Sequence, residues 1–303
     1  MKNRPTPVNA VVLSSPAKLN LFLAITGRRA DGFHELVSVV TTVEFGDTLT
    51  VEPRARGYSL VCDDPALEID ETNLVLKAAR AFAAATGWTG GAHFSLVKRI
   101  PMGAGLGGGS SNATMALRAL NQLAGEPLTN DALAAVAATL GSDCPLFLQG
   151  GPLIMRGRGE VIEALPAGAA ARLRGRRALI FKPPLGISTV WAYRQMAAGA
   201  PGSYLPVDKA EARVSAWLAA AGEEGAAEAL LFNNMEGPAF AKFIALPVLL
   251  ERLRAEFGLA PRMSGSGSAC FAFLPEGAPI GGIEARIREL WGPEVFVTET
   301  RLR

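Results

Sequence analysis

The stretch PMGAGLGGGSSNAT, residues 101–114, is the most informative part of this sequence. Five glycines lie within residues 103–109, and two serines and an asparagine follow them directly. The apolar spacing after the glycines predicts a helix over about 110–124, and the run AHFSLVK before them predicts a strand. The stretch is therefore a glycine-rich connection between a strand and a helix.

Two well-known glycine motifs are disfavoured by the surrounding sequence. The residues from Gly103 to Gly108 satisfy G-x-G-x-x-G, but a dinucleotide fingerprint also needs a second strand after the helix, ending in an acidic residue. Here LTNDALAAVAATL predicts another helix over 130–140 instead. A Walker P-loop needs a Lys directly after the last glycine, and the sequence has no Lys between Lys98 and Lys182.

Phosphate binding requires neither motif. Glycines let backbone N–H groups turn toward an anion without obstruction by a Cβ atom. A helix beginning at Ser110-Ser111 adds unpaired N–H donors and the positive end of its dipole. We expect Ser110 to cap this helix. The alternative is a flexible turn with a Ser cap and no ligand, for which five glycines are more than a turn needs.

Composition limits the classes of partner. The net charge of the 303-residue chain is +2, which argues against a dedicated binder of nucleic acid or of membrane surfaces. The three cysteines are far apart and show neither a disulfide framework nor metal spacing, which favours a reducing compartment, the cytoplasm. No signal peptide or membrane-spanning run is expected, and neither histidine belongs to a zinc-type cluster.

The order of the predicted elements favours an α+β fold with two domains. Short, separate β-like runs occupy most of the first hundred residues, and helices are predicted near 188–198, 208–221 and 236–257. Strands and helices do not alternate regularly, which argues against a doubly wound sheet. The Pro-, Ala- and Arg-rich segment 166–177 is the expected linker. It places the predicted domains at residues 1–165 and 166–303.

Two further blocks accompany the glycine-rich stretch, namely SPAKLNLFLAITGRRADGFHEL at 15–36 and RMSGSGSACFAF at 262–273. Together the three blocks resemble the GHMP kinases, small-molecule kinases named for galactose, homoserine, mevalonate and phosphomevalonate. They lie near the start, middle and end, so the resemblance covers nearly the whole chain. The first block is similar to the branch that phosphorylates the 2-hydroxyl of 4-diphosphocytidyl-2-C-methyl-D-erythritol in the non-mevalonate isoprenoid pathway.

The resemblance also implies a fold and a set of ligands. It implies an N-terminal domain like ribosomal protein S5 domain 2 and a ferredoxin-like C-terminal domain. It further implies ATP and Mg²⁺, and a small-molecule substrate that carries a cytidine diphosphate group. Neither nucleic acid nor a membrane is an expected partner, and the sequence indicates no oligomeric state.

Lys18 and Asp143 are the predicted catalytic residues. Lys18 lies in the apolar run AKLNLFL, where an unpaired ammonium is costly, and it is one of only seven lysines. Asp143, in GSDCPLF, would by itself be a turn or cap residue. In the family the matching Lys faces a catalytic Asp, which accepts the proton of the substrate hydroxyl. The sequence leaves open whether this Asp is a true base or mainly an electrostatic positioner.

The resemblance places ATP on the glycine-rich stretch and its neighbours. Asn73 and Lys98 are candidates for the adenine side, with a helix-capping Asn and a solvated Lys as the alternatives. Ser110 is the candidate contact to Mg²⁺, whose other ligands are expected to be phosphates and water. The predicted ATP-binding residues are Pro101, Met102, Gly103, Ala104, Gly105, Leu106, Gly107, Gly108, Gly109, Ser110, Ser111, Asn73 and Lys98.

The acceptor is expected on the first and third blocks. Asn20 shares a strand face with Lys18 because the two are separated by one residue. By resemblance, Phe33 stacks on the cytidine, His34 hydrogen-bonds the base edge, and Tyr193 is a second stacking ring. A core Phe and a satisfied His are the alternative. The predicted substrate-binding residues are Asn20, Phe33, His34, Thr189, Tyr193, Gly265, Ser266 and Gly267.

Three other functions remain as alternatives. The first keeps the fold and changes the acceptor to homoserine, mevalonate or a sugar, against which DGFHEL argues. The second is a non-catalytic sensor or interaction protein on the same fold, which would have no need to keep both Lys18 and Asp143. The third is an oxidoreductase, which the missing strand after the glycine-rich helix disfavours.

Overall fold

The computed structural model describes residues 10–221 and 226–303. They form two compact units that interleave along the chain. The first unit consists of the described part of Met1–Ala17 together with Gly46–Ile100 and Gly107–Gln149. The second unit consists of Lys18–Phe45, Pro101–Leu106 and the described part of Gly150–Arg303. The single predicted boundary between residues 165 and 166 remains a prediction.

Two long strands, β1 (Val11–Arg28) and β2 (His34–Arg54), contribute residues to both units. The prediction of several short, separate strands over this region is wrong. Gly46 in β2 permits the continuity, because a Cβ atom there would lie 2.3 Å from the backbone oxygen of Ser15 in β1. A glycine inside a strand commonly marks such a close approach of another backbone.

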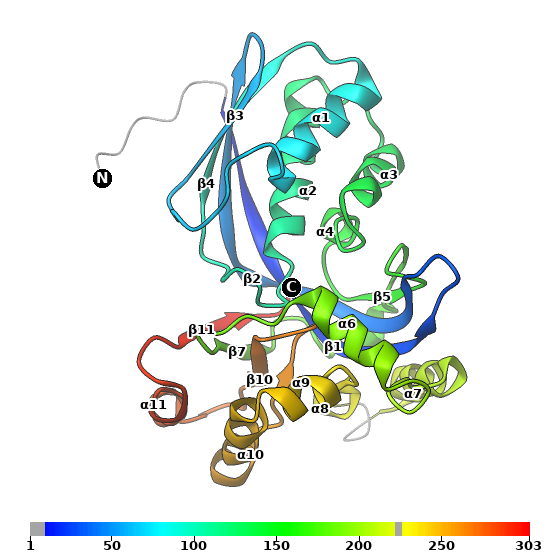
Figure 1. Ribbon diagram of the computed structural model, residues 1–303, viewed down its shortest axis with the longest axis vertical. Helices are drawn as coiled ribbons and strands as arrows, with labels where there is room; N and C mark the ends of the chain where they lie inside the picture. The colour runs from blue at the N-terminus through cyan, green and yellow to red at the C-terminus, as the bar shows by residue number, and fades with distance from the viewer. Residues whose placement is uncertain (1–9, 222–225) are drawn as a thin grey trace. The chain divides into compact units, whose positions relative to one another are not determined.

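β1 and β2 belong to a sheet in which the strands β3, β4, β2 and β1 lie in that order. In the first unit, helices pack against the part of this sheet that the unit contains. β4 pairs antiparallel with β2 and parallel with β3. Helix α1 packs against α2 and β3 (Figure 1), and Phe82 and Phe94 are fully buried there. The elements of this unit, besides parts of β1 and β2, are β3 (Tyr58–Cys62), α1 (Leu74–Thr86), β4 (Gly91–Val97), α2 (Gly108–Leu123), α3 (Asn130–Leu140) and α4 (Leu146–Gln149).

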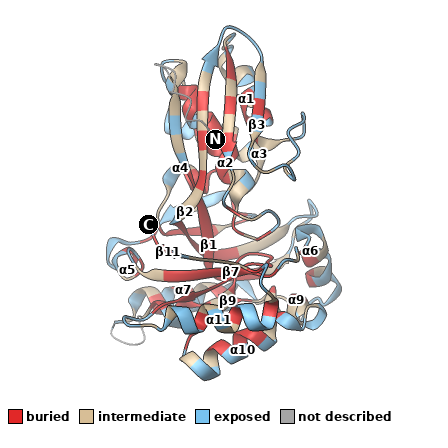
Figure 2. Ribbon diagram, turned by 90° about the vertical axis from the view of Figure 1, so that its left-hand side faces the viewer, coloured by how far each residue is buried: buried red, intermediate tan, exposed pale blue. Residues whose placement is uncertain are grey.

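The second unit contains an antiparallel four-stranded sheet in the order β11-β7-β10-β9. Its core includes Phe181, Leu250 and Ile283, and Figure 2 shows buried residues along β7 and on the faces of α10 and α11. The sheet and its covering helices are β7 (Arg177–Lys182), α9 (Glu236–Lys242), α10 (Ala245–Phe257), β9 (Arg262–Met263), β10 (Cys270–Phe273), α11 (Ile280–Trp291) and β11 (Phe296–Arg301).

The remaining elements of the second unit include three strands that extend the sheet of β1 and β2. β5 pairs antiparallel with β2 and with β6, and β8 pairs parallel with β1. These elements are β5 (Leu153–Arg156), β6 (Val161–Ala164), α5 (Ala167–Ala171), α6 (Thr189–Ala198), α7 (Val207–Ala219), α8 (Ala227–Leu230) and β8 (Phe232–Asn233).

Two predictions about the second half of the chain are wrong. The predicted helix 236–257 is two helices, α9 and α10, separated at Phe243. Pro247 explains the break, because its ring would clash with the carbonyl of the residue four positions earlier and it offers no N–H to that carbonyl. The predicted linker contains helix α5, in which Ala169 and Ala170 are buried, so it is packed structure.

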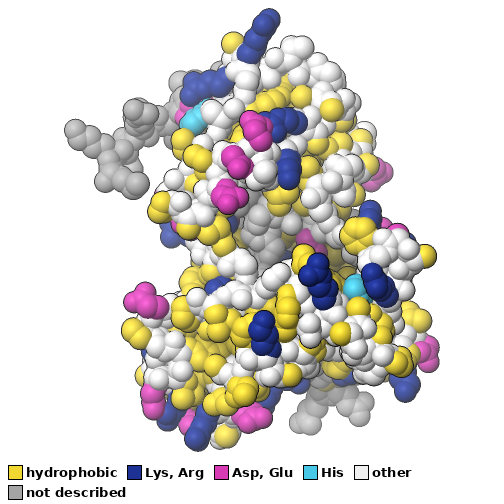
Figure 3. Space-filling view, viewed as in Figure 1, with side chains coloured by type: hydrophobic (Ala, Val, Ile, Leu, Met, Phe, Trp, Pro, Cys, Tyr) yellow, Lys and Arg dark blue, Asp and Glu magenta, His cyan; other side chains and the backbone are white. Residues whose placement is uncertain are grey.

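The mixed α+β class is confirmed by this arrangement. Throughout residues 10–221 and 226–303, none of the helices combines the length and apolar character needed to span a bilayer. On the face drawn in Figure 3, basic and acidic side chains are interspersed, in keeping with the small net charge of +2.

Candidate functional site

In the second unit, two glycine-rich loops pack against each other: the first loop, residues 101–106, and the second loop, residues 264–268. The N–H of Ala269 donates to the backbone oxygen of Ala104 at 3.0 Å, and the Ser264 hydroxyl donates to that of Gly105 at 3.2 Å. Gly105 has a left-handed φ of 75°, and a Cβ atom on it would lie 2.2 Å from the Ser264 oxygen. The loops therefore pack backbone to backbone, which only glycine permits at this position.

Lys18 and Asn20 lie beside this pair of loops. The Lys18 ammonium donates to the Asn20 side-chain oxygen, so the prediction that both share one strand face is confirmed. The Lys18 N–H donates to the Leu106 oxygen at 2.9 Å, and a Cβ atom on Gly265 would lie 3.2 Å from the Lys18 Nζ atom. Both side chains are buried, and the backbone N–H groups of these two residues bond the strand to Leu106 in the first loop and to the Ser264 hydroxyl in the second.

Ser38 completes the hydrogen bonding of Asn20. The Asn20 amide donates to the Ser38 hydroxyl at 2.9 Å, and that hydroxyl donates to the Phe22 oxygen at 2.7 Å. Asn20 is therefore oriented, with its carbonyl oxygen toward Lys18. Ser38 was missed from the sequence because its only signal is a polar residue within an otherwise apolar strand.

Asn233 and Glu236 hold the second loop in place and were also missed. The Asn233 amide donates to the Met263 and Gly265 backbone oxygens, both at 2.8 Å. The Glu236 carboxylate accepts from the Met263 N–H at 2.9 Å, and burial raises the pKa of this carboxyl. The signal in the sequence was the polar run FNNME between apolar segments.

Helix α2 begins earlier than predicted, in the first unit. Its N-cap is Gly107, with φ 72°, which makes no side-chain capping hydrogen bond. The prediction that Ser110 is the cap is wrong, because the glycine at 107 takes the left-handed conformation there and the two that follow continue into the first turn. The first N–H groups of the helix therefore remain available to an acceptor.

Asp143 lies on the turn after α3, next to the first turn of α2 within the first unit. The Cys144 N–H closes this turn on the Gly141 oxygen at 3.1 Å. Burial raises the pKa of the Cys144 thiol to about 11; the Asp143 charge also raises it, and hydrogen bonds with Ser110 and Thr114 oppose the rise. Asp143 and Ser110 thus share Cys144 as a neighbour. Lys18 belongs to the other unit, and its pairing with Asp143 stays a prediction.

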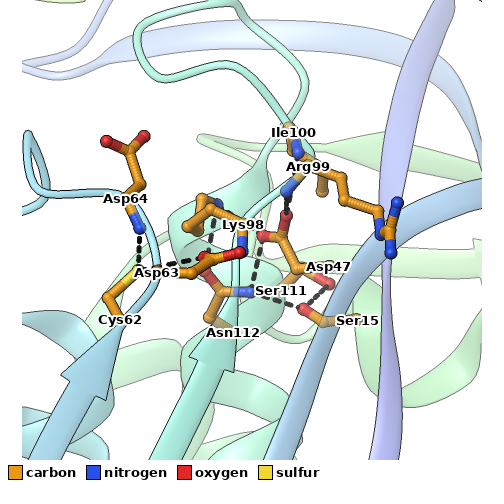
Figure 4. A network of polar contacts seen from close by, with 10 residues as sticks. All are labelled: Ser15, Asp47, Cys62, Asp63, Asp64, Lys98, Arg99, Ile100, Ser111 and Asn112. Carbon is orange, nitrogen blue, oxygen red and sulfur yellow. Dashed lines mark hydrogen bonds and ion pairs between the residues drawn. The ribbon is translucent and has the colours of Figure 1, made fainter. Parts of the chain in front are cut away.

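Asn73 and Lys98, the candidates for the adenine side, both have partners in the first unit. Asn73 caps α1 by accepting from the Val75 N–H at 2.9 Å, and its amide donates to the Glu68 oxygen at 2.7 Å. Lys98 forms a buried ion pair with Asp47, drawn in Figure 4. The solvated-Lys alternative is therefore wrong, and the predicted ATP contacts of both residues stay predictions.

His34 lies among aromatic rings of the second unit. Its ring centroid is 4.8 Å from that of Tyr193 and 5.9 Å from that of Tyr204. Burial, and secondarily the Arg28 charge, lower the pKa of His34, so the imidazole is neutral at pH 7. Its Nε2 atom and the Tyr204 hydroxyl are buried and have no hydrogen-bond partner among the described residues. Such orphaned atoms are uncommon and call for an explanation.

Phe33 and Thr189 occupy different parts of this region. Phe33 is 52% exposed, so the alternative of a core Phe is wrong; the Arg158 guanidinium carbon lies 4.9 Å from its ring centroid. The Thr189 and Ser266 hydroxyls are hydrogen-bonded at 3.0 Å, which joins the start of α6 to the second loop. Arg158 was missed, because an Arg in a glycine-rich turn has no distinctive pattern.

Comparison with known proteins agrees with this geometry. Residues 73–151 match the family model described as GHMP kinases N terminal domain. A 4-diphosphocytidyl-2-C-methyl-D-erythritol kinase of Protochlamydia amoebophila is 39% identical over 262 residues, covering 86% of this chain and 84% of that protein.

Solved structures give the same result for the fold. A crystal structure of 4-(cytidine 5'-diphospho)-2C-methyl-D-erythritol kinase is 36% identical, with a TM-score of 0.75, covering 96% of this chain and 99% of that one. Homoserine kinase from Cytophaga hutchinsonii, at 17% identity and a TM-score of 0.73, shares the fold alone. The chain therefore belongs to the GHMP kinases and, within them, to the family of 4-diphosphocytidyl-2-C-methyl-D-erythritol kinases.

Proposed function

We propose that this protein transfers the γ-phosphate of ATP to the 2-hydroxyl of 4-diphosphocytidyl-2-C-methyl-D-erythritol, in the cytoplasm. The observation that carries the choice of acceptor is the neutral, half-buried His34, whose buried Nε2 atom has no partner among the described residues and whose ring lies beside that of Tyr193. A hydrogen-bonding group next to an aromatic face suits a pyrimidine base. A homoserine, mevalonate or sugar acceptor has no such base for this pair to recognise.

The cytidine diphosphate group would lie along the first block. His34 would hydrogen-bond the base edge, and the exposed Phe33 ring and Tyr193 would stack on it. Arg158, next to Phe33, adds a cation suited to a diphosphate. Thr189 and Ser266, with the flanking Gly265 and Gly267, would contact the acceptor near the transferred phosphate.

The ATP phosphates would lie on the glycine-rich loop and the uncapped start of α2. Backbone N–H groups at a helix N-terminus favour anions through their direction and through the helix dipole. The described residues hold no group of three or more His, Cys, Asp or Glu side chains placed for a metal ion. A Mg²⁺ ion bound with ATP would take most of its ligands from phosphates and water, with the Ser110 hydroxyl as a protein contact.

In the transfer step the substrate 2-hydroxyl oxygen forms a bond to the γ-phosphorus, the bond from that phosphorus to the ADP oxygen breaks, and the hydroxyl proton passes to the Asp143 carboxylate. Lys18 would keep that carboxylate ionised. This pairing rests on the family resemblance. Asn20, oriented by Ser38, would present its side chain to the acceptor hydroxyls.

The proposal is tested by measuring ADP release with ATP and Mg²⁺ against a panel of alcohols. The panel contains 4-diphosphocytidyl-2-C-methyl-D-erythritol, homoserine, mevalonate and galactose. We expect turnover with the cytidylyl alcohol alone, and the product phosphorylated at its 2-hydroxyl by ³¹P NMR. Turnover only with homoserine, mevalonate or galactose would overturn the assigned acceptor.

Substitution of His34 tests the base-recognition role. We expect His34→Ala to raise the KM for the cytidylyl substrate by about 10- to 100-fold, the cost of losing a buried hydrogen bond, and to leave the KM for ATP nearly unchanged. His93→Ala is the matched control, because the only other histidine bonds to Ser59 in the first unit. Equal increases in both KM values for His34→Ala would contradict the role.

A further inference from the structure

We propose that Asp47 is a positioning residue for the glycine-rich loop, and that Lys98 acts by neutralising Asp47 instead of binding the nucleotide. The loop residues 101–107 join Ile100 to Gly108, and the Asp47 carboxylate holds residues on both sides of them. The inference rests on the proposed role of this loop in binding ATP, and its test separates the two.

One carboxylate oxygen of Asp47 holds the segment that enters the loop. It accepts from the backbone N–H groups of Arg99 at 2.7 Å and Ile100 at 2.8 Å. These are the last residues before the glycine-rich stretch. Figure 4 shows the carboxylate pointing at this segment from β2.

The other oxygen of Asp47 holds the helix that leaves the loop. It accepts from the Asn112 amide at 2.8 Å and from the Lys98 ammonium. Asn112 is in the second turn of α2. A single side chain therefore closes the loop at its base, which shortens the segment that must be ordered when a ligand binds.

Burial makes these contacts hard to replace with water. The Asp47 side chain is fully buried, and that of Lys98 is 6% exposed. The Asn112 amide also donates to the Ser15 hydroxyl at 2.8 Å, and Ser15 donates to Ser111 at 2.8 Å. The polar side chains around Asp47 thus bond to one another (Figure 4), and each would be costly to leave unpaired.

The Lys98 ammonium lies at the start of α2, where its positive charge has to be neutralised by Asp47. A Cβ atom on Gly108 would lie 3.2 Å from the Lys98 Nζ atom, so the ammonium lies against the first residue of α2. A cation is unfavourable at a helix N-terminus. The Asp47 carboxylate offsets it and leaves the N–H groups of this helix end for an anionic ligand.

The test compares Asp47→Asn, Lys98→Met and the double variant by ADP affinity and by hydrogen exchange of residues 98–114 in the ligand-free protein. We expect Asp47→Asn to raise the Kd for ADP at least about tenfold, to speed exchange in this segment, and to leave the KM for the cytidylyl substrate within about threefold. The side-chain oxygen of an Asn at position 47 can still accept from both backbone N–H groups. Its NH₂ group, however, is a donor and would face the Lys98 ammonium, which is also a donor. Adding Lys98→Met removes that conflict, so the double variant should bind ADP more tightly than Asp47→Asn.

Asp63→Asn is the matched control. Asp63 also accepts from this segment, from the Lys98 N–H at 2.7 Å, but it does not hold α2, so we expect little change in Kd or exchange. If Asp47→Asn does not fold, Asn112→Ser keeps the Asp47 carboxylate and removes its bond to α2, together with the Asn112 contacts to Ser15 and Lys98. This variant should weaken ADP binding and speed exchange in the same direction.

Two results would overturn the inference. Unchanged exchange and ADP affinity in Asp47→Asn would show that the carboxylate does not position the loop. A Lys98→Met variant as impaired as Asp47→Asn, with additive losses in the double variant, would show that Lys98 binds the nucleotide directly. Wild-type protein that binds no ADP would instead overturn the proposed function, and this inference with it.

Discussion

Replacing Asp143 with Asn is expected to lower kcat by about 10²- to 10⁴-fold, the range typical of a lost general base, while ATP affinity changes little. The amide keeps the size and the turn geometry but cannot take up the hydroxyl proton. Asp143 precedes Cys144, whose thiol is hydrogen-bonded to Ser110 in the first turn of α2, so Asp143 lies near the start of this helix, where the phosphates are proposed to bind. Steady-state turnover and calorimetric ATP binding measure the two effects separately.

Asp131→Asn is the matched control for this variant. Asp131 is an exposed carboxylate in the first turn of α3 within the same unit, and its loss should leave kcat nearly unchanged. Near-normal turnover in Asp143→Asn would remove Asp143 from the mechanism. A matching loss of ATP affinity would show that it acts on binding.

Replacing Gly105 with Ala is expected to lower kcat/KM for ATP by at least about 100-fold, because the added methyl group cannot be accommodated without moving a backbone. The new Cβ atom would lie 2.2 Å from the Ser264 oxygen and 3.0 Å from the Gly267 nitrogen. Both are backbone atoms of the second loop, so the two loops must separate. Steady-state kinetics and the thermal unfolding midpoint check the variant.

Gly103→Ala isolates the packing effect from backbone strain. Gly103 also has a left-handed φ, 60° against 75° for Gly105, but a Cβ atom on it would have no neighbouring atom within 4 Å. Both variants therefore carry about 1–2 kcal/mol of conformational cost, and only Gly105→Ala adds the clash. Equal losses in the two variants would contradict the proposed backbone-to-backbone packing.

Features set by neighbours in the chain were predictable. Helix α1 begins at the Asn73 cap and ends at Gly87 in the left-handed conformation, as residue type and position indicate. The break at Phe243 had a signal too, namely Pro247, but the apolar periodicity on both sides of it suggested one continuous helix. The merging of short runs into β1 and β2 had a weaker signal, because Gly46 resembles a turn residue when its neighbour Ser15 is unknown.

The order of residues was enough to establish the chemistry and the family of this protein. Strand and helix periods are local geometry, so Lys18 and Asn20 had to share a face, and the glycine-rich stretch had to lead into a helix. Only the folded chain reveals the partners: Asp47 with Lys98, His34 among Tyr193 and Tyr204, and Gly105 against Ser264. These contacts join residues that are far apart in the chain, so local spacing does not encode them. Burial strengthens polar contacts because an unpaired polar group is costly away from water.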